Sequence, residues 1–561
     1  IASNGKGGGL QIGSDEDPAI LNLYIRGSTF RANEALHGGA LALETKNKWI
    51  IEGQCIFENN KAKNKGGAIY VNTDLAKDDD YFTGIGSVIR NCSFIHNEAT
   101  NNGNYGTIIY FTQTKEFDTK PEIEIDGTNV MNNMGEQGYL ISSGYKNLVI
   151  NDLEISGEGI EPQRFGFLYA FSDGETTLNN CKFNRVGSTS GLGNAIRIEE
   201  TPTIQINSCN FIDCVSNGQR GDRNNFIIYG GGDYGKTLIA PNCDFNFTST
   251  NLYSTAICIE RYATFMLTGC CFTNCWSNNN NGNARLYTYP GAIRYGPNAD
   301  RAYEYNDKSD KCRLVIRGCT FENCNHIDGP DQTGGRVIHG YGATNPVLEN
   351  CTIKDTVDGG YIFRWQYLVD NATELTLKEI RFENNKASCI DGGGSGIYII
   401  KTNKINFDNC YFIKNNQTSA ESYGGGGFVC GNSSPEISNR EIEFNDCYFE
   451  DNIVPNGKNG GSLYICSPQR QTTVYKCTFT DTRNINANGV ASLGGAIFIT
   501  QDQGGVMIED CTFTHTQSIR DGNAICIDHD TNLVTIKDCV FTDCHHNQRF
   551  SVIWSWGNNL T

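Results

Sequence analysis

Short stretches in which apolar residues alternate with polar ones recur along the whole chain. The segment Val88-Ile89-Arg90-Asn91-Cys92-Ser93-Phe94 is typical, because a short apolar stretch is followed by Cys and Phe on alternate positions. A period of two residues predicts β-strands, and the Gly, Asn and Asp residues between the stretches predict tight corners. We find no window of useful length with the 3.6-residue period of a helix. The pattern therefore predicts an all-β fold.

One signature, Cys-x-Phe after an apolar triplet, returns at nearly constant spacing. It is seen at Cys319–Phe321, Cys447–Phe449 and Cys511–Phe513. Aligning the chain on this signature gives seventeen rows, about 32 residues apart, with Phe in fourteen of them and Cys two residues earlier in thirteen. Met131, Ile155 and Ile353 take the Phe position in the other three rows. The Phe positions are residues 30, 57, 94, 131, 155, 183, 211, 245, 272, 321, 353, 382, 412, 449, 479, 513 and 541.

A second signature, Gly-Gly-Ala followed by apolar-x-apolar, alternates with the first. Clear copies begin at Gly38, Gly66 and Gly494. Each repeat is therefore predicted to form three short strands, as one coil of a parallel β-helix does. A β-propeller blade is the alternative, but it needs about 40–50 residues, more than one repeat contains. We predict a single right-handed parallel β-helix (a solenoid) of about 17 coils, continuous over residues 1–561 and a segment of a longer chain.

Composition narrows the functions that such a scaffold could serve. The 561 residues include 45 Lys and Arg against 63 Asp and Glu, a net charge of −18, which argues against nucleic acid and anionic membranes as partners. No stretch is long and apolar enough to predict a transmembrane segment. The 63 Gly and 24 Cys belong to the repeat. Glycines suit corners where φ is positive or where coils crowd, and Phe fills the interior.

The cysteines divide into two groups. The thirteen of the Cys-x-Phe column should face inward, as buried thiols that pack like small apolar residues. Four others, Cys214, Cys275, Cys324 and Cys544, stand where other rows carry Asn three residues after Phe. Cys275 and Cys324 fall on consecutive rows, so stacking would bring them within disulfide range, and we predict them as a candidate disulfide. The spacing does not predict a zinc site, because there is no CxxC.

The middle residue of each third strand should point away from the interior, and this column is rich in aromatic residues. We predict that it forms an outward stripe that contacts sugar rings or a partner chain. The alternative is that aromatic residues are simply good strand formers partly covered by loops. The stripe consists of Tyr70, Tyr110, Tyr169, Phe363, Tyr398, Tyr464, Phe498 and Trp554.

Insertions lengthen some coils and are candidate contact loops, since long loops in compact proteins are usually functional or disordered. We place them near residues 72–86, 276–290 and 296–312. The latter two carry Tyr287, Tyr289, Tyr303 and Tyr305. The run Asp78-Asp79-Asp80 could bind Ca²⁺ through its oxygens, although the favoured interpretation is a solvated loop. No other cofactor is predicted.

The two signatures together resemble the repeats of chlamydial polymorphic membrane proteins and of related protist surface proteins. Their motifs are GGA-[Ile/Leu/Val/Tyr], present here at Gly38–Leu41, Gly66–Ile69 and Gly494–Ile497, and Phe-x-x-Asn, present for example at Phe57/Asn60 and Phe449/Asn452. The resemblance implies an extracellular or cell-surface adhesin that binds a protein or glycan of a host or neighbouring cell. In such a place the sequons at Asn371, Asn416 and Asn432, which we expect in corner loops, are candidate glycosylation sites.

The leading functional prediction is an extracellular structural or adhesive rod that displays loops and the aromatic stripe. Because the end coils would offer open sheet edges, this prediction includes end-to-end self-association into a fibre. The rival is a polysaccharide lyase or glycoside hydrolase on the same fold. Partial active-site motifs, Arg197-Ile198-Glu199 and His339-Gly340, fall on different coils and do not assemble a carboxylate pair. Catalysis is thus left open, with no catalytic or metal-binding residue predicted.

Overall fold

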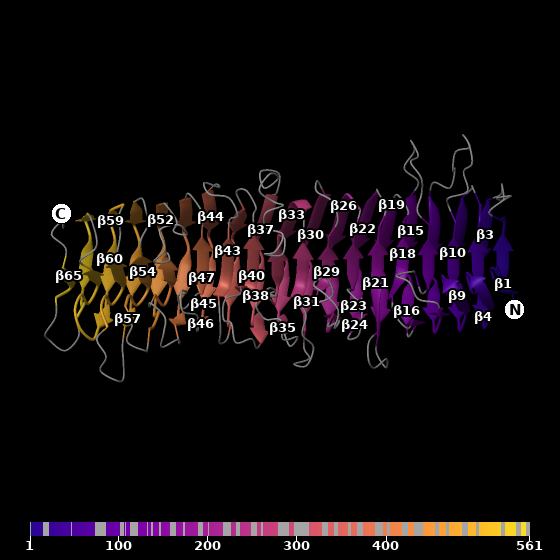
Figure 1. Ribbon diagram of the computed structural model, residues 1–561, viewed down its shortest axis with the longest axis horizontal. Coiled ribbons are helices and arrows are strands. Elements are labelled where there is room, and N and C mark those ends of the chain that lie inside the picture. Colours follow the sequence, from indigo (N-terminus) through magenta and orange to yellow (C-terminus); the bar gives the residue numbers. More distant parts are fainter. Residues whose placement is uncertain are drawn as a thin grey trace. The chain divides into compact units, whose positions relative to one another are not determined.

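The structure is a computed structural model, which describes most of the chain (Figure 1). No description is given for residues 1, 15–21, 46–47, 73–85, 101–105, 107, 113–121, 132, 136–137, 145–146, 158–163, 172–173, 189–194, 200, 217–225, 232–235, 248–254, 260–261, 279–290, 297–312, 328–334, 342–345, 357–360, 367–373, 388–395, 401–403, 418–424, 431–440, 455–458, 467–470, 485–491, 501–503, 529–532, 546–550 and 557–561.

The chain forms two compact units, Ile1–Met266 and Leu267–Thr561. The described part of each is built from strands, with no helix, and therefore with no helix that could cross a membrane. Each coil contributes one strand to each of three parallel sheets. We call them the first sheet (the apolar triplet), the Phe sheet (the Cys-x-Phe strand) and the glycine sheet (the strand after the glycines). Short corner strands connect the Phe sheet to the glycine sheet in many coils.

The first unit contains the following strands. Its first sheet has β3 (Leu23–Arg26), β7 (Trp49–Glu52), β11 (Ser87–Arg90), β15 (Glu122–Asp126), β19 (Asn147–Asn151), β22 (Glu175–Asn179), β26 (Thr203–Asn207) and β30 (Lys236–Pro241). Its Phe sheet has β4 (Thr29–Arg31), β8 (Ile56–Glu58), β12 (Ser93–Ile95), β16 (Asn129–Met131), β20 (Glu154–Ser156), β23 (Lys182–Asn184), β27 (Asn210–Ile212) and β31 (Asp244–Asn246). Its glycine sheet has β2 (Leu10–Ile12), β6 (Leu41–Leu43), β10 (Ile69–Val71), β14 (Ile109–Phe111), β18 (Gly138–Ser143), β21 (Arg164–Ala170), β25 (Ile196–Ile198), β29 (Phe226–Gly230) and β32 (Thr255–Ile259). The corner strands are β1 (Ala2–Lys6), β5 (Glu34–His37), β9 (Lys61–Lys65), β13 (Glu98–Ala99), β17 (Met134–Gly135), β24 (Gly187–Ser188) and β28 (Val215–Ser216).

The second unit repeats this plan, and β33 (Tyr262–Thr268) spans the sequence boundary between the units. Its first sheet has β37 (Arg313–Arg317), β41 (Val347–Glu349), β44 (Glu374–Lys378), β48 (Lys404–Asp408), β52 (Glu441–Asn445), β55 (Thr472–Tyr475), β59 (Val506–Glu509) and β63 (Val534–Lys537). Its Phe sheet has β34 (Cys271–Thr273), β38 (Thr320–Glu322), β42 (Thr352–Lys354), β45 (Arg381–Glu383), β49 (Tyr411–Ile413), β53 (Tyr448–Glu450), β56 (Thr478–Thr480), β60 (Thr512–Thr514) and β64 (Val540–Thr542). Its glycine sheet has β36 (Ile293–Tyr295), β40 (Gly335–Tyr341), β43 (Tyr361–Gln366), β47 (Ile397–Ile400), β51 (Phe428–Cys430), β54 (Leu463–Cys466), β58 (Ile497–Thr500), β62 (Ile525–Ile527) and β65 (Ile553–Ser555). The corner strands are β35 (Trp276–Asn278), β39 (Asn325–Ile327), β46 (Lys386–Ala387), β50 (Asn416–Gln417), β57 (Arg483–Asn484) and β61 (Gln517–Ser518).

Successive coils stack in strict register, which places like residues above like. In the Phe sheet, Phe412 pairs with Phe449 and Phe449 with Phe479, and their ring centroids lie 4.7 and 4.6 Å apart with nearly parallel planes. The rings are fully buried. Aromatic stacking and burial thus fill the interior of each unit, and the predicted parallel β-helix is confirmed.

One row of the predicted alignment was wrong by a residue. Val130, not Met131, pairs with Phe94 in the Phe column, and Met131 is 42% exposed on the other face of β16. The row contains neither Cys nor Phe, so the sequence offered no anchor for its register. Because alternate residues of a strand face opposite sides, a slip of one residue moves a side chain from the interior to the surface.

The two glycines of the second signature serve different purposes at the corner that precedes the glycine sheet. Gly66 has a φ of 64°, which favours glycine, whereas Gly39 lies so close to the next coil that a Cβ there would be 2.1 Å from the carbonyl oxygen of Gly67. Both reasons anticipated from the sequence therefore apply: the first glycine meets both, because a Cβ at Gly66 would also lie 2.2 Å from the carbonyl oxygen of Ile69, and the second is required by crowding alone.

Buried polar side chains tie each coil to the one before it. The Nδ2 group of Asn452 donates a hydrogen bond to the carbonyl of Phe412 (2.7 Å), and its Oδ1 accepts one from the backbone N–H of Asn415 (3.0 Å). Cys324, at the same position of its coil, donates instead through Sγ to the carbonyl of Phe272 (3.3 Å). Asn and Cys can replace each other here because both can donate to this buried carbonyl.

Candidate functional site

The outward column of the glycine sheet in the first unit contains Tyr70 and Tyr110, as predicted. The two residues pair across β10 and β14, and their rings stack 5.9 Å apart. Their exposed fractions are only 7% and 5%. The Nζ of Lys65 lies 4.4 Å from the Tyr110 ring centroid and donates to its hydroxyl (3.2 Å), while His37 packs against Tyr70. These tyrosines point outward but are covered.

The same column in the second unit is also largely covered. Tyr464, Phe498, Cys526 and Trp554 occupy successive coils. The first three are buried together, and Leu493 and the half-buried Trp554 pack against them. The prediction that these side chains bind a partner is not tested by the structure, but little of their surface is available to one.

Phe363 was assigned to this column incorrectly. It pairs with Ile338 and Ile397, which are interior residues, and is fully buried, while Arg364 takes the outward register position. Conversely, Tyr229 was missed, although it pairs with Arg197 in the outward column. Both errors reflect strands that lack the Gly-Gly-Ala anchor. Tyr169 does lie in the column, half-buried.

Several predicted contact residues lie outside what the structure describes. These are Tyr287, Tyr289, Tyr303, Tyr305, Asp78–Asp80, Asn371 and Asn432, together with the side chain of Tyr398 on β47. The predicted insertion at 276–290 begins with a strand, because Trp276–Asn278 form β35 and pair with β39. Asn416 is likewise not in a loop: it lies in β50, half-buried and paired with Lys386.

The candidate disulfide is not formed: Cys275 and Cys324 are buried thiols, stacked on adjacent coils as predicted. None of the twenty cysteines whose side chains are described is in a disulfide. In-register side chains of parallel strands point the same way about 4.8 Å apart, whereas a disulfide brings Cβ atoms to about 3.8 Å. Burial, followed by the neighbouring Cys324 thiol, raises the pKa of Cys275. Burial therefore keeps Cys275 a neutral thiol.

The more accessible polar and aromatic side chains lie on the outside of the Phe sheet in the second unit. We call this surface, formed by β38, β42, β45, β49 and β53, the outer Phe face. Arg381, Tyr411 and Tyr448 follow one another on it in register. The Arg381 guanidinium lies 5.9 Å from the Tyr411 ring centroid, and the two tyrosine centroids are 6.3 Å apart. Both tyrosines are half-buried, and 42% of the Arg381 side chain is exposed.

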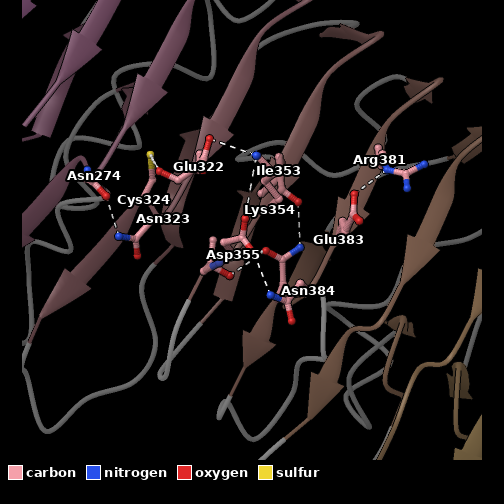
Figure 2. Close-up of polar contacts among 12 residues, drawn as sticks. Asn274, Glu322, Asn323, Cys324, Ile353, Lys354, Asp355, Arg381, Glu383 and Asn384 are labelled. Atoms are coloured by element: carbon pink, nitrogen blue, oxygen red, sulfur yellow. Dashed lines mark hydrogen bonds and ion pairs between the residues drawn. The ribbon is translucent and has the colours of Figure 1, made fainter.

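Polar contacts continue this surface along neighbouring coils (Figure 2). Lys354 pairs with Glu322 (3.0 Å), and Asn384 donates to Asp355 (2.7 Å). Arg381 pairs with Glu383 (2.7 Å) in the same strand, and this contact holds the pKa of Glu383 below its usual value. Exposed pairs of this kind contribute at most about 1 kcal/mol each. Their effect is to hold charged side chains in fixed positions.

Tyr411 and Tyr448 were not among the contact residues predicted from the sequence. Both occupy the middle of a Cys-x-Phe signature, at Cys410-Tyr411-Phe412 and Cys447-Tyr448-Phe449, where the outward position could have been read from strand alternation. The arrangement offers aromatic and charged contacts rather than a reaction centre. Among the residues that the structure describes, no group of three or more His, Cys, Asp and Glu could hold a metal ion.

Comparisons with known proteins agree with this architecture. Residues 296–442 and 368–561 match the model of a right-handed β-helix region, which defines the class of scaffold. Residues 54–72, which contain both signatures from Cys55 to Asn72, match the Chlamydia polymorphic membrane protein repeat. The chain carries repeats of this type, and such repeats are consistent with a structural or adhesive protein of the cell surface. No curated protein matches the chain.

Proposed function

We propose that this chain is an extracellular structural or adhesive protein that uses outward side chains of its β-helix to contact a protein or glycan of another cell. The observation that supports the proposal most directly is the outer Phe face. It presents Arg381, Tyr411 and Tyr448 in register on a scaffold whose interior is filled. Arg and Tyr are the residue types that most often dominate contact surfaces, because they combine apolar area with hydrogen bonding.

The rigidity of this surface also suits adhesion. The strands beneath it are held by backbone pairing on both sides, so the side chains need little ordering when a partner binds. The neighbouring ion pairs of Lys354 and Arg381 fix charges of both signs beside the tyrosines. A partner with mixed polar groups therefore fits better than a purely anionic one, in agreement with the net charge of −18.

The test is attachment of the purified chain to cells, and to arrays of glycans and surface proteins. We expect the double variant Tyr411→Ala/Tyr448→Ala to lose most of the binding. Thr478→Ala/Thr512→Ala is the matched control, because these residues occupy the same outward column in the two coils that follow Tyr448. Equal binding by the tyrosine variant and the parent would exclude the outer Phe face, and no attachment by the parent would exclude adhesion.

Two finer parts of the proposal have their own measurements. Adhesion predicts binding to glycans without chemical change, whereas new reducing ends or unsaturated sugars would identify the rival lyase or hydrolase. End-to-end self-association predicts species larger than the monomer in sedimentation velocity, growing with protein concentration. A single monomeric species over that range would contradict the fibre.

A further inference from the structure

The corner that leads from the first sheet to the Phe sheet presents an exposed asparagine in a similar setting in each unit. Asn91 in the first unit and Asn350 in the second have positive φ angles of 51° and 52°, and both residues are exposed. The residues that follow them, Cys92 and Cys351, are buried in the Cys-x-Phe column. Each asparagine therefore stands on a tight turn that directs it away from the interior.

Both asparagines begin the sequence Asn-x-Ser/Thr, at which oligosaccharides are attached to secreted chains. The third residue is Ser93 in one coil and Thr352 in the other, and each lies half-buried on the outside of its Phe-sheet strand, before a buried residue. The oligosaccharide is added before the chain folds, so the fold must keep the modified side chain outside. These coils do so, because only the Cys of each sequence packs inside.

The neighbouring coils leave room beside each of these asparagines. Because the strands before the corner pair in register, Asn91 lies next to Gly127 and Asn350 next to Gly318. A Cβ at Gly318 would meet no atom nearer than the backbone nitrogen of Gly269 at 3.8 Å, and a Cβ at Gly127 would meet only the side chain of Asn91. The space that another side chain would fill is therefore open to the first sugar of a glycan.

The two side-chain amides are also not needed to hold the coils together. Within the described part of the chain, neither amide takes part in a hydrogen bond. By contrast, Asn180 stands at the same corner of another coil but donates to Oδ1 of Asp152, and its sequence continues with Cys and Lys. Asn416 does begin an acceptor sequence, but it lies half-buried in β50 and its Oδ1 is closed off from solvent. A glycan on Asn416 would have to displace this strand.

We propose that Asn91 and Asn350 accept N-linked glycans when the chain passes through a secretory pathway, an inference that rests on the extracellular location proposed above. In the transfer, Nδ2 of the asparagine forms a bond to the anomeric carbon of an oligosaccharide, and the bond from that carbon to a lipid diphosphate carrier breaks. The amide loses one proton and the lipid diphosphate leaves, so nothing is oxidised or reduced. The folded corner then holds each glycan on the outside of its unit.

The test is to secrete the full chain from cultured human cells behind a signal peptide and to release its N-glycans enzymatically in water labelled with heavy oxygen. Peptide mass spectrometry should then find Asn91 and Asn350 converted to labelled Asp, and Asn416 unchanged. Asn91→Gln and Asn350→Gln should each remove one glycan, seen as one step in gel mobility relative to the parent. Asn180→Gln is the matched control at the same corner and should remove none.

The proposal is overturned if either Asn91 or Asn350 is unmodified in the secreted chain, or if the chain is secreted only when both are replaced. These outcomes are separate from the test of adhesion, which measures attachment through Tyr411 and Tyr448. Unmodified asparagines on a chain that still attaches to cells would remove the glycans and leave the proposed function in place. Glycosylated asparagines on a chain that does not attach would do the reverse.

Discussion

At the scale of single residues, each coil is tied to its predecessor by one kind of interaction that several side chains can make. The column cysteines show it clearly: Sγ of Cys447, Cys477 and Cys511 each donates to a carbonyl of the preceding coil at 3.4 Å. At the other corner of the Phe sheet, Asn415 and Asn452 perform the same task with stronger donors. The identity of the residue matters less than its ability to donate to a buried carbonyl.

This leads to a prediction at Asn452. Asn452→Leu has nearly the same volume but removes the side-chain hydrogen bond to the Phe412 carbonyl and leaves the Asn415 N–H without its acceptor, and should destabilise the second unit by about 2–4 kcal/mol. Asn452→Cys keeps a donor for Phe412 and should cost clearly less. Urea unfolding measures both variants against the parent. If the two substitutions lower the free energy of unfolding equally, the hydrogen bond to the Phe412 carbonyl is not the reason why Asn recurs at this position.

The face on which a residue lies was predicted correctly where the strand has Cys-x-Phe or follows Gly-Gly-Ala, and incorrectly where it lacks these signatures. Phe94 and Phe449 were placed correctly because Cys and Phe show which alternate residues of the strand face the interior. Phe363 was placed on the wrong face because its strand has no Gly-Gly-Ala to set the register. Burial was harder still: Tyr110 points outward by parity, yet Lys65 from another coil covers it, which no strand pattern reveals.

At the scale of elements, the corners decide whether a coil can close. Gly494 has a φ of 70°, and a Cβ there would lie 2.3 Å from the carbonyl oxygen of Ile497. Gly505 also has a positive φ, 97°, but a Cβ there would meet nothing nearer than the Leu533 carbonyl oxygen at 3.4 Å. The two glycines therefore separate the cost of conformation from the cost of crowding.

We predict that Gly494→Ala destabilises the protein far more than Gly505→Ala. The second substitution should cost about 1–2 kcal/mol, the usual penalty for a side chain at positive φ, and the first should add to this the displacement of a backbone carbonyl. Thermal unfolding of both variants provides the comparison. A smaller effect at Gly494 than at Gly505 would show that the corner can shift to admit a Cβ.

At the scale of the whole molecule, the thiols are the chemistry that the fold most clearly controls. Among the described cysteines, Cys271 is exposed and Cys539 is half-buried, while the other eighteen are buried. The thiolate is the reactive form, and burial raises the pKa of Cys92 and Cys214 to about 12. In the folded protein, the eighteen buried cysteines that the structure describes should therefore react only slowly with thiol reagents.

Iodoacetamide labelling at pH 8 followed by peptide mass spectrometry tests this. Among the twenty cysteines whose side chains are described, Cys271 should be modified first and Cys539 more slowly, with the eighteen buried thiols labelled only after unfolding in urea. Cys271→Ser is the control, because it should remove the fast phase and leave the rest of the pattern intact. Early labelling of Cys447 or Cys477 in the folded protein would contradict the buried column.

The same burial predicts sensitivity to alkali. In the unfolded chain a thiol loses its proton near pH 9, while folded Cys214 keeps it until about pH 12. The unfolded state then binds fewer protons, so stability is complete below pH 9 and falls by about 1.4 kcal/mol per pH unit above it for each such thiol. Several other coils have Asn three residues after Phe, where Cys214 stands. Cys214→Asn should therefore reduce the slope of stability against pH by that amount. An unchanged slope between pH 9 and 11 would contradict the assignment.

The ties between coils also have a mechanical consequence. When a unit is pulled along its stacking direction, every coil carries the same force in turn, so the weakest junction yields first rather than the average one. Thr482 and Thr516 lie three residues after Phe in their coils, where other coils have Asn or Cys. Their buried hydroxyls make no hydrogen bond to the preceding coil. Extension of the second unit should therefore begin at these two junctions, where neighbouring coils would separate first under tension.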